Sequence, residues 1–160
     1  MASPEARHAR FRFVGIHVPP YCERWIDGSD KLRKNLVPLL EKYDVDMCLS
    51  GHTHEYERGE RNHVHYVISG GGSWLDHGEP IVKDWAHVVV GGAHDVPGTW
   101  AKESSPGVLG KPQPIQGGLF NGYALIRIRE DHLRLQTHGF NADGSENGVL
   151  DTVEIGAAAP

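Results

Sequence analysis

Two short apolar segments, each followed directly by histidine, constrain the fold of this chain most strongly. Residues 11–16 (FRFVGI) are apolar and partly β-branched, and they end at His17 and a double proline. Residues 45–50 (VDMCLS) end in a similar way, at a Gly-His-Thr-His segment that carries His52 and His54. Short apolar runs that stop at turn-forming residues are typical of buried strands. The pattern therefore predicts two buried strands that present histidines at their carboxyl ends.

The segment between these strands predicts a helix. Ser29 is a suitable N-cap, and Asp30 places a carboxylate in the first turn. Leucines then follow at the spacing of one helical face as far as Tyr43, and Pro38 inside this pattern predicts a kink or a split. Residues 64–69 (VHYVIS) predict a third strand that ends in a glycine turn. A strand, helix, strand order favours an α/β fold with a mixed sheet.

The second half of the chain predicts antiparallel structure. Residues 91–118 are rich in glycine and proline, and we expect a long irregular loop there, of the kind that is often functional. Residues 122–129 and 133–139 alternate apolar and polar side chains, which predicts a C-terminal antiparallel hairpin. A last strand is expected over residues 149–155, after two turns.

Composition excludes several classes of protein. The chain has 160 residues, which indicates one domain, and its net charge of −5 argues against binding to nucleic acid or to an anionic membrane. No apolar run approaches the ~20 residues of a membrane helix, and no secretory signal is visible, so we expect a cytoplasmic protein. Cys22 and Cys48 allow one disulfide at most, and free buried thiols are the favoured interpretation.

The histidines at the strand ends have the spacing of a metal site. Carboxyl ends of strands gather at one edge of a sheet, so His17 can meet the other two. Residues two apart in an extended segment project to the same side, so His52 and His54 can reach one centre. We expect Gly51 to allow a close backbone approach or a positive φ. Loop histidines satisfied by hydrogen bonds are the alternative, but their placement on two strand ends favours a metal.

These residues also resemble a known family. Residues 17–21 (HVPPY), 50–58 (SGHTHEYER) and 67–72 (VISGGG) are similar to the C-terminal half of the calcineurin-like metallophosphoesterases, in the purple acid phosphatase-like branch. The resemblance covers roughly residues 11–156, which we take as the core of a single truncated domain over residues 1–160. It implies a dinuclear site, with His17 and His52 on one metal and His54 on the other.

The sequence also departs from this family. The Asp-x-His, Gly-Asp and Gly-Asn-His motifs of the family's N-terminal half have no counterpart before His17. The chain therefore looks like half of the family's α/β sandwich, and because of the missing motifs we expect one divalent metal per chain rather than two. Zinc is the first choice, and iron or manganese are alternatives. An uncovered inner face of the sheet would drive association, so we expect a homo-oligomer, most simply a dimer.

The expected activity is metal-dependent hydrolysis of a small-molecule ester, either a phosphate mono-, di- or triester or a similar activated ester. A His-ligated metal with an open position lowers the pKa of bound water to about 7. Glu55 and Tyr21 are candidate catalytic residues, and Arg58 is a candidate phosphate ligand. We expect slow and promiscuous turnover. The alternatives are a non-catalytic metal-binding remnant, or a subunit that needs a separate N-terminal half.

Several other residues have a less specific interpretation. For Glu57 and Arg58 a solvated, mutually paired cluster is the slightly favoured alternative, and for His63 and His65 a surface position is favoured. Cys48 is expected to pack as a small hydrophobe. One histidine near the expected loop could complete a second metal site with an acidic neighbour, and tryptophans there could wall a pocket. These residues are His77, His87, His94, Asp76, Asp84, Asp95, Trp74, Trp85 and Trp100.

Overall fold

The computed structural model describes residues 3–22, 29–71, 99–101, 113–119, 121–140 and 144–156. Its elements follow one another in the order α1 (Pro4–His8), β1 (Phe13–Gly15), α2 (Asp30–Asn35), α3 (Val37–Lys42), β2 (Met47–Ser50), β3 (Tyr56–Arg61), β4 (Val64–Ser69), β5 (Thr99–Ala101), β6 (Gln113–Leu119), β7 (Asn121–Ile128), β8 (His132–Phe140) and β9 (Glu146–Gly156). No helix in the described ranges is long and apolar enough to cross a membrane.

The predicted helix forms, and it is split as the proline indicated. The Ser29 side chain accepts a hydrogen bond from the backbone N–H of Leu32 and so caps α2. Pro38 lies in the first turn of α3, where its missing N–H removes no intrahelical hydrogen bond. The two helices meet at Leu36, and Leu40 of α3 is fully buried against the sheet.

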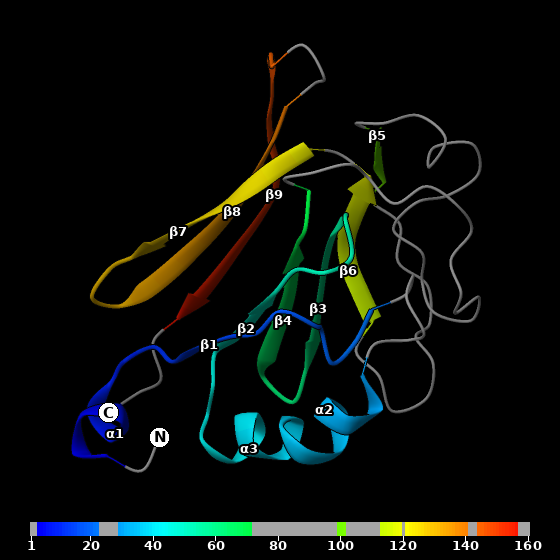
Figure 1. Ribbon diagram of the computed structural model, residues 1–160. Coiled ribbons are helices and arrows are strands. Elements are labelled where there is room, and N and C mark those ends of the chain that lie inside the picture. The colour runs from blue at the N-terminus through cyan, green and yellow to red at the C-terminus, as the bar shows by residue number, and fades with distance from the viewer. Residues whose placement is uncertain are drawn as a thin grey trace.

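Sheet A, the larger of two sheets, has the strand order β1-β2-β4-β3-β6-β5 (Figure 1). β1, β2 and β4 are parallel, so their carboxyl ends lie at one edge, and the other strands pair antiparallel. β3 and β4 are joined at Asn62 and His63, whose positive φ angles of 46° and 65° suit a tight hairpin turn.

The sequence interpretation missed three strands of sheet A. β3 was not expected, because its charged residues indicated a solvated segment. β5 and β6 lie inside residues 91–118, so the expectation of one continuous irregular loop is wrong for those two stretches. Both strands pair at the β3 side of the sheet.

Sheet B contains the C-terminal strands in the order β7-β8-β9, all antiparallel. The predicted hairpin and last strand are confirmed. Alternation along β8 buries Leu133, Leu135 and Thr137, while Arg134 and its alternate neighbours face outward. This is the pattern of a sheet with one packed face and one wet face.

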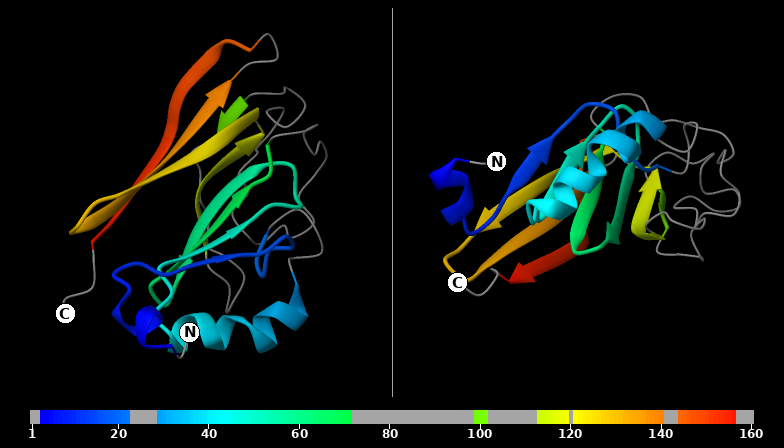
Figure 2. Two further views of the ribbon diagram at one scale, coloured as in Figure 1. Left: turned by 60° about the vertical axis from the view of Figure 1, so that its left-hand side comes forward. Right: turned by 90° about the horizontal axis from the view of Figure 1, so that it is seen from below.

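Both faces of sheet A are covered within the chain. Helices α2 and α3 lie on one side and sheet B lies on the other (Figure 2). On the side of sheet B, Met47, Tyr56 and Val67 pack against Leu133 and Leu135. Both faces of the β1–β4 part of sheet A therefore pack within the chain, while Tyr123, Ile128 and Val149 of sheet B are exposed. The oligomeric state stays a prediction.

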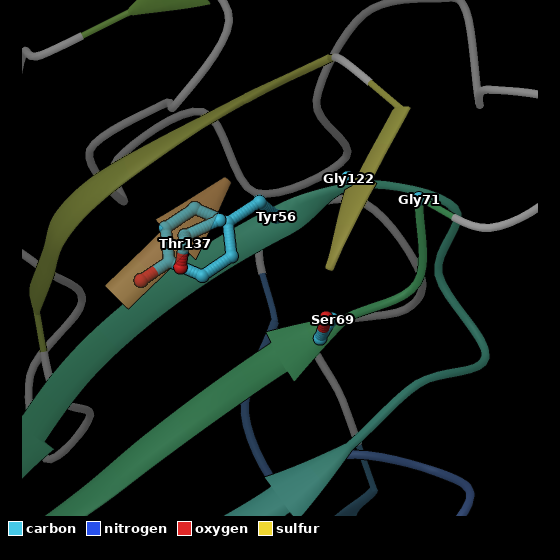
Figure 3. Close-up of a pocket in the computed structure, with 5 residues that line it drawn as sticks. All are labelled: Tyr56, Ser69, Gly71, Gly122 and Thr137. Atoms are coloured by element: carbon cyan, nitrogen blue, oxygen red, sulfur yellow. The ribbon is translucent and has the colours of Figure 1, made fainter. Parts of the chain in front are cut away.

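A buried polar network joins the two sheets. Arg58 of β3 donates two hydrogen bonds to Asp151 of β9, from Nε to Oδ2 at 2.7 Å and from Nη2 to Oδ1 at 3.0 Å. Tyr56 Oη donates to the same carboxylate at 2.5 Å, and Figure 3 shows its ring pointing toward Thr137 of β8. Burial raises the pKa of the Tyr56 phenol, and the Asp151 carboxylate raises it further. The phenol therefore stays a donor, and the carboxylate accepts three hydrogen bonds.

Candidate metal centre

His17 and His52 meet at the carboxyl ends of β1 and β2. Nε2 of His17 and Nδ1 of His52 are 3.0 Å apart, and the rings lie edge to face with centroids 4.8 Å apart. The backbone holds the two segments together, since the Gly51 N–H donates to the His17 carbonyl at 3.1 Å. His17 is exposed to solvent and His52 is half-buried. The structure thus brings together two histidines that are 35 residues apart.

A strained turn places His52 in this pair. Its φ is 72°, in the left-handed region that few side chains adopt. The Thr53 N–H donates to the Gly51 carbonyl at 2.9 Å, across His52. A bond between residues two apart around a positive φ is the pattern of the classic γ-turn, which is rare and strained. The expectation for Gly51 is wrong: the positive φ belongs to His52, and the space around Gly51 is open.

The pair fits part of a metal site. Two imidazole nitrogens that bind one cation at about 2.1 Å lie about 3.0 Å apart in octahedral geometry and about 3.4 Å apart in tetrahedral geometry. The observed separation of 3.0 Å equals the octahedral value, and it is also the distance of an N–H···N hydrogen bond in which one of the two rings carries the proton. His54 is half-buried and its Nδ1 is enclosed by protein. Within the described ranges, no group of three His, Cys, Asp or Glu side chains is arranged to hold a metal ion. The described residues therefore bring two candidate donors together and no third.

The two expected catalytic residues lie in the interior. Tyr21 is buried against Tyr66, with ring centroids 5.0 Å apart, and the Arg33 guanidinium lies 5.8 Å from its ring centre. Burial raises the pKa of the Tyr21 phenol, so it is neutral at physiological pH. Glu55 has no exposed surface, and its backbone carbonyl accepts from the Gly70 N–H at 2.9 Å. Neither side chain is presented to solvent beside the exposed His17.

Arg58 is also buried, and it pairs with Asp151 as described above. Glu57, its neighbour in β3, is only 4% exposed. The interpretation of these two residues as a solvated cluster is wrong. The expected contact between Arg58 and a phosphate is not supported either, because a bidentate ion pair occupies the guanidinium. Asp151 gave no signal in the sequence, since its partner is 93 residues away.

The two cysteines are buried, and the two histidines of the β3–β4 hairpin differ in exposure. Cys22 and Cys48 are free and buried, as favoured from the sequence. Burial raises the pKa of the Cys48 thiol to about 12, so it packs as a small hydrophobe and not as a metal ligand. His63 is exposed as expected, with its Nε2 3.8 Å from Asp44. The surface prediction is wrong for His65, which is buried and faces Glu60.

The second metal site and the pocket wall that we expected lie outside the described residues. This applies to His77, His87, His94, Asp76, Asp84, Asp95, Trp74 and Trp85, and to the side chain of Trp100.

A small crevice between the sheets is not a substrate site. It is lined by Tyr56, Ser69, Gly71, Gly122 and Thr137 (Figure 3), and it has no space for a molecule as large as water. Its Gly122 N–H donates to the Gly71 carbonyl at 3.2 Å, which joins the end of β4 to sheet B.

Comparisons with known proteins define the fold. No family model and no curated protein sequence matches the chain. Among solved structures, GAP50, the anchor in the inner membrane complex of Plasmodium, aligns with a TM-score of 0.66 at 19% identity, over 97% of this chain and 39% of its own. The purple acid phosphatase PPD1 from yellow lupin (Lupinus luteus) seeds aligns with a TM-score of 0.65 at 20% identity, over 97% of this chain and 26% of its own.

The class that these observations define is the α/β metallophosphoesterase fold, with a mixed sheet and a C-terminal antiparallel sheet. At these identities the likeness concerns the fold alone. The chain spans 39% and 26% of the lengths of the two structures, and one of them is an enzyme while the other is an anchor. Function therefore has to be argued from the site.

Proposed function

We propose that this chain is a metal-dependent hydrolase of phosphate esters or similar activated esters, with His17 and His52 as ligands of one divalent cation. The observation that carries the proposal is the 3.0 Å separation of His17 Nε2 and His52 Nδ1 at the carboxyl edge of sheet A. In α/β sheets this edge is where ligands bind. The fold of a purple acid phosphatase supports the same reaction class.

The residues have separate roles in this proposal. His52 lies in a hydrogen-bonded turn, while His17 is exposed to solvent. His54 is the proposed third ligand, and it reaches the pair through a movement of residues 52–54. The cation, zinc before iron or manganese, would supply charge stabilisation and an acidified water. Since Glu55 and Tyr21 are buried and Arg58 is engaged, turnover should be slow and specificity loose.

Metal content and activity test the proposal together. We expect the purified protein to bind one zinc and to hydrolyse bis(4-nitrophenyl) phosphate or an aryl phosphotriester, with loss of both properties on chelation. His52→Ala should abolish both, because one ligand of an incomplete set is removed. His63→Ala is the matched control, because His63 is an exposed histidine in the β3–β4 turn. Equal rates for the metal-stripped and zinc-loaded protein would contradict the proposal.

A second candidate is a subunit that is completed by another chain. β1 ends the strand order of sheet A, and its residues pair with β2 alone among the described strands. An edge strand of this kind can pair with a strand of a partner. The candidates are a separate N-terminal half or a second copy of this chain. Light scattering of the purified protein tests the second copy, and a monomeric mass together with turnover would contradict this candidate.

We also propose a cytoplasmic location. The two buried free thiols support it, because the cytosol keeps cysteines reduced. Cell fractionation tests the location.

A further inference from the structure

Gly70 lies where the segment that carries His52 and His54 packs on the end of β4. A Cβ atom added to Gly70 would lie 1.7 Å from the Thr53 carbonyl oxygen, 2.8 Å from the Thr53 carbonyl carbon and 3.2 Å from the His54 Cα. All three atoms belong to the backbone, so no side-chain rotation can relieve the overlap. Thr53 itself is 1% exposed. The absence of a side chain at residue 70 therefore lets the two segments touch.

A hydrogen bond fixes the same contact. The Gly70 N–H donates to the Glu55 carbonyl at 2.9 Å, directly after the His52–His54 segment. Strained turns such as the one at His52 persist only where the surrounding structure determines them. The buried Thr53 backbone against Gly70 is one such determinant, and the Gly51 bond to His17 is another.

A side chain at residue 70, one residue beyond the end of β4, would push the histidine segment and the chain after β4 apart. β4 is hydrogen-bonded on both sides, with Ile68 opposite Ser50 of β2 and Ser69 opposite Tyr56 of β3. The segment before β3 has no ladder pairing in the described structure. Ordinary carbon–oxygen contact requires roughly 3.5 Å, so the Thr53 carbonyl must retreat by more than an ångström. Metal ligand distances tolerate only about 0.2 Å.

From this geometry we propose that Gly70 is a positioning residue for the metal site, acting through the backbone of Thr53 on the imidazole of His52. The inference rests on the proposed function for its metal, but the placement of the histidine pair is a property of the metal-free chain. The glycine that the pair requires is therefore the one after β4, while Gly51 inside the Gly-His-Thr-His segment has open space around it.

The test compares Gly70→Ala with Gly15→Ala in the full chain. Gly15 ends β1, two residues before His17, and an added Cβ there meets nothing within 4 Å. In the metal-free proteins, NMR signals of the His17 and His52 ring nitrogens should shift in Gly70→Ala and stay unchanged in Gly15→Ala. By calorimetric titration with zinc, affinity should fall roughly 10- to 100-fold in Gly70→Ala alone. Circular dichroism should show both variants folded.

Each outcome decides the proposal. Wild-type ring signals and zinc affinity in Gly70→Ala would overturn it. If the wild type binds no zinc but the ring signals shift in Gly70→Ala, the proposed function is wrong and the positioning of the pair stands. If Gly70→Ala does not fold, hydrogen exchange of the wild type decides instead. The Gly70 amide should then be protected like the amides of β4, and exchange at the rate of an open loop would overturn the proposal.

Discussion

Two polar clusters join distant parts of this chain, and they differ in exposure to solvent, in backbone strain and in hydrogen bonding. The pair of His17 and His52 is partly exposed, and a strained backbone supports it. The network of Arg58, Tyr56 and Asp151 is buried between two sheets, and three hydrogen bonds occupy its carboxylate. The first cluster borders solvent, whereas the second is enclosed between the two sheets.

This difference separates a binding site from a structural link. A buried ion pair is tolerated only when its hydrogen bonds are complete, and a complete set leaves nothing for a ligand. A strained residue at an exposed edge weakens the fold and persists where the surrounding structure imposes it. The histidine pair is therefore the better candidate for function, although Arg58 belongs to the same motif in the sequence.

The largest expected effect is the loss of the buried carboxylate. Asp151→Asn leaves the Arg58 guanidinium buried without its countercharge, and this should lower the free energy of unfolding by about 3–5 kcal/mol. Urea denaturation measures it. Glu154→Gln in the same strand is the control, because its bond to Arg134 is exposed and should contribute at most about 1 kcal/mol.

The same network allows a sharper test. Replacing both charged partners, as Arg58→Met with Asp151→Leu, should recover part of the lost stability, because no unpaired charge remains while the buried Tyr56 hydroxyl loses its acceptor. Zinc binding should survive in this double variant. If it is lost together with stability intact, Arg58 or Asp151 serves the metal site, and the separation of the two clusters is wrong.

A smaller effect is expected from relief of backbone strain. His52→Gly should raise the free energy of unfolding by up to about 1 kcal/mol, because glycine adopts a positive φ without steric cost. It should also abolish zinc binding. His63→Gly is the matched control, since His63 has a φ of 65° in the β3–β4 turn. That variant should gain similar stability in thermal unfolding and should keep its metal. Retention of zinc by His52→Gly would refute the assignment of His52.

The smallest effect concerns the buried His65. Burial lowers the pKa of its imidazole below 6.5, while Glu60 opposes this shift. The unfolded chain then takes up a proton at about pH 6.5 and the folded chain only at lower pH. Stability should therefore fall as pH drops below about 6.5. His65→Gln should flatten this acid limb in unfolding experiments from pH 7.5 to 5, whereas the exposed His63→Gln should not. An unchanged slope in His65→Gln would contradict the burial of that ring.

Local patterns in the sequence predicted a large part of the fold. The N-cap at Ser29, the split at Pro38 and the strand over Val64–Ser69 all depend on residues within a few positions of each other. The alternation along β7 and β8 likewise reports one packed face. Capping, proline geometry and alternation act over one turn or one strand, so they can be recognised without knowledge of the partner elements.

Strand β3 could not be predicted from local sequence patterns. Its sequence, YERGER, has the charge of a solvated segment, yet its first four residues are buried. The reason is Asp151, which neutralises Arg58 from the far end of the chain. β6 (QPIQGGL) was missed for a similar reason, because a glycine- and proline-containing strand forms there through pairing with β3 and β5 and not through local propensity. β5 (TWA) is only three residues long and pairs with β6.

The sequence by itself determined that histidines stand at the ends of two strands, and that an antiparallel meander closes the chain. Only the tertiary structure decided that His17 meets His52 with no third donor grouped beside them among the described residues, that Arg58 is a core residue, and that Gly70 and not Gly51 is the point of close approach. The physical reason is the separation along the sequence between the residues that interact. Strand periodicity and capping depend on neighbouring residues. The contact across 35 residues depends on the pairing of β1 with β2, and the contact across 93 residues depends on how the two sheets pack.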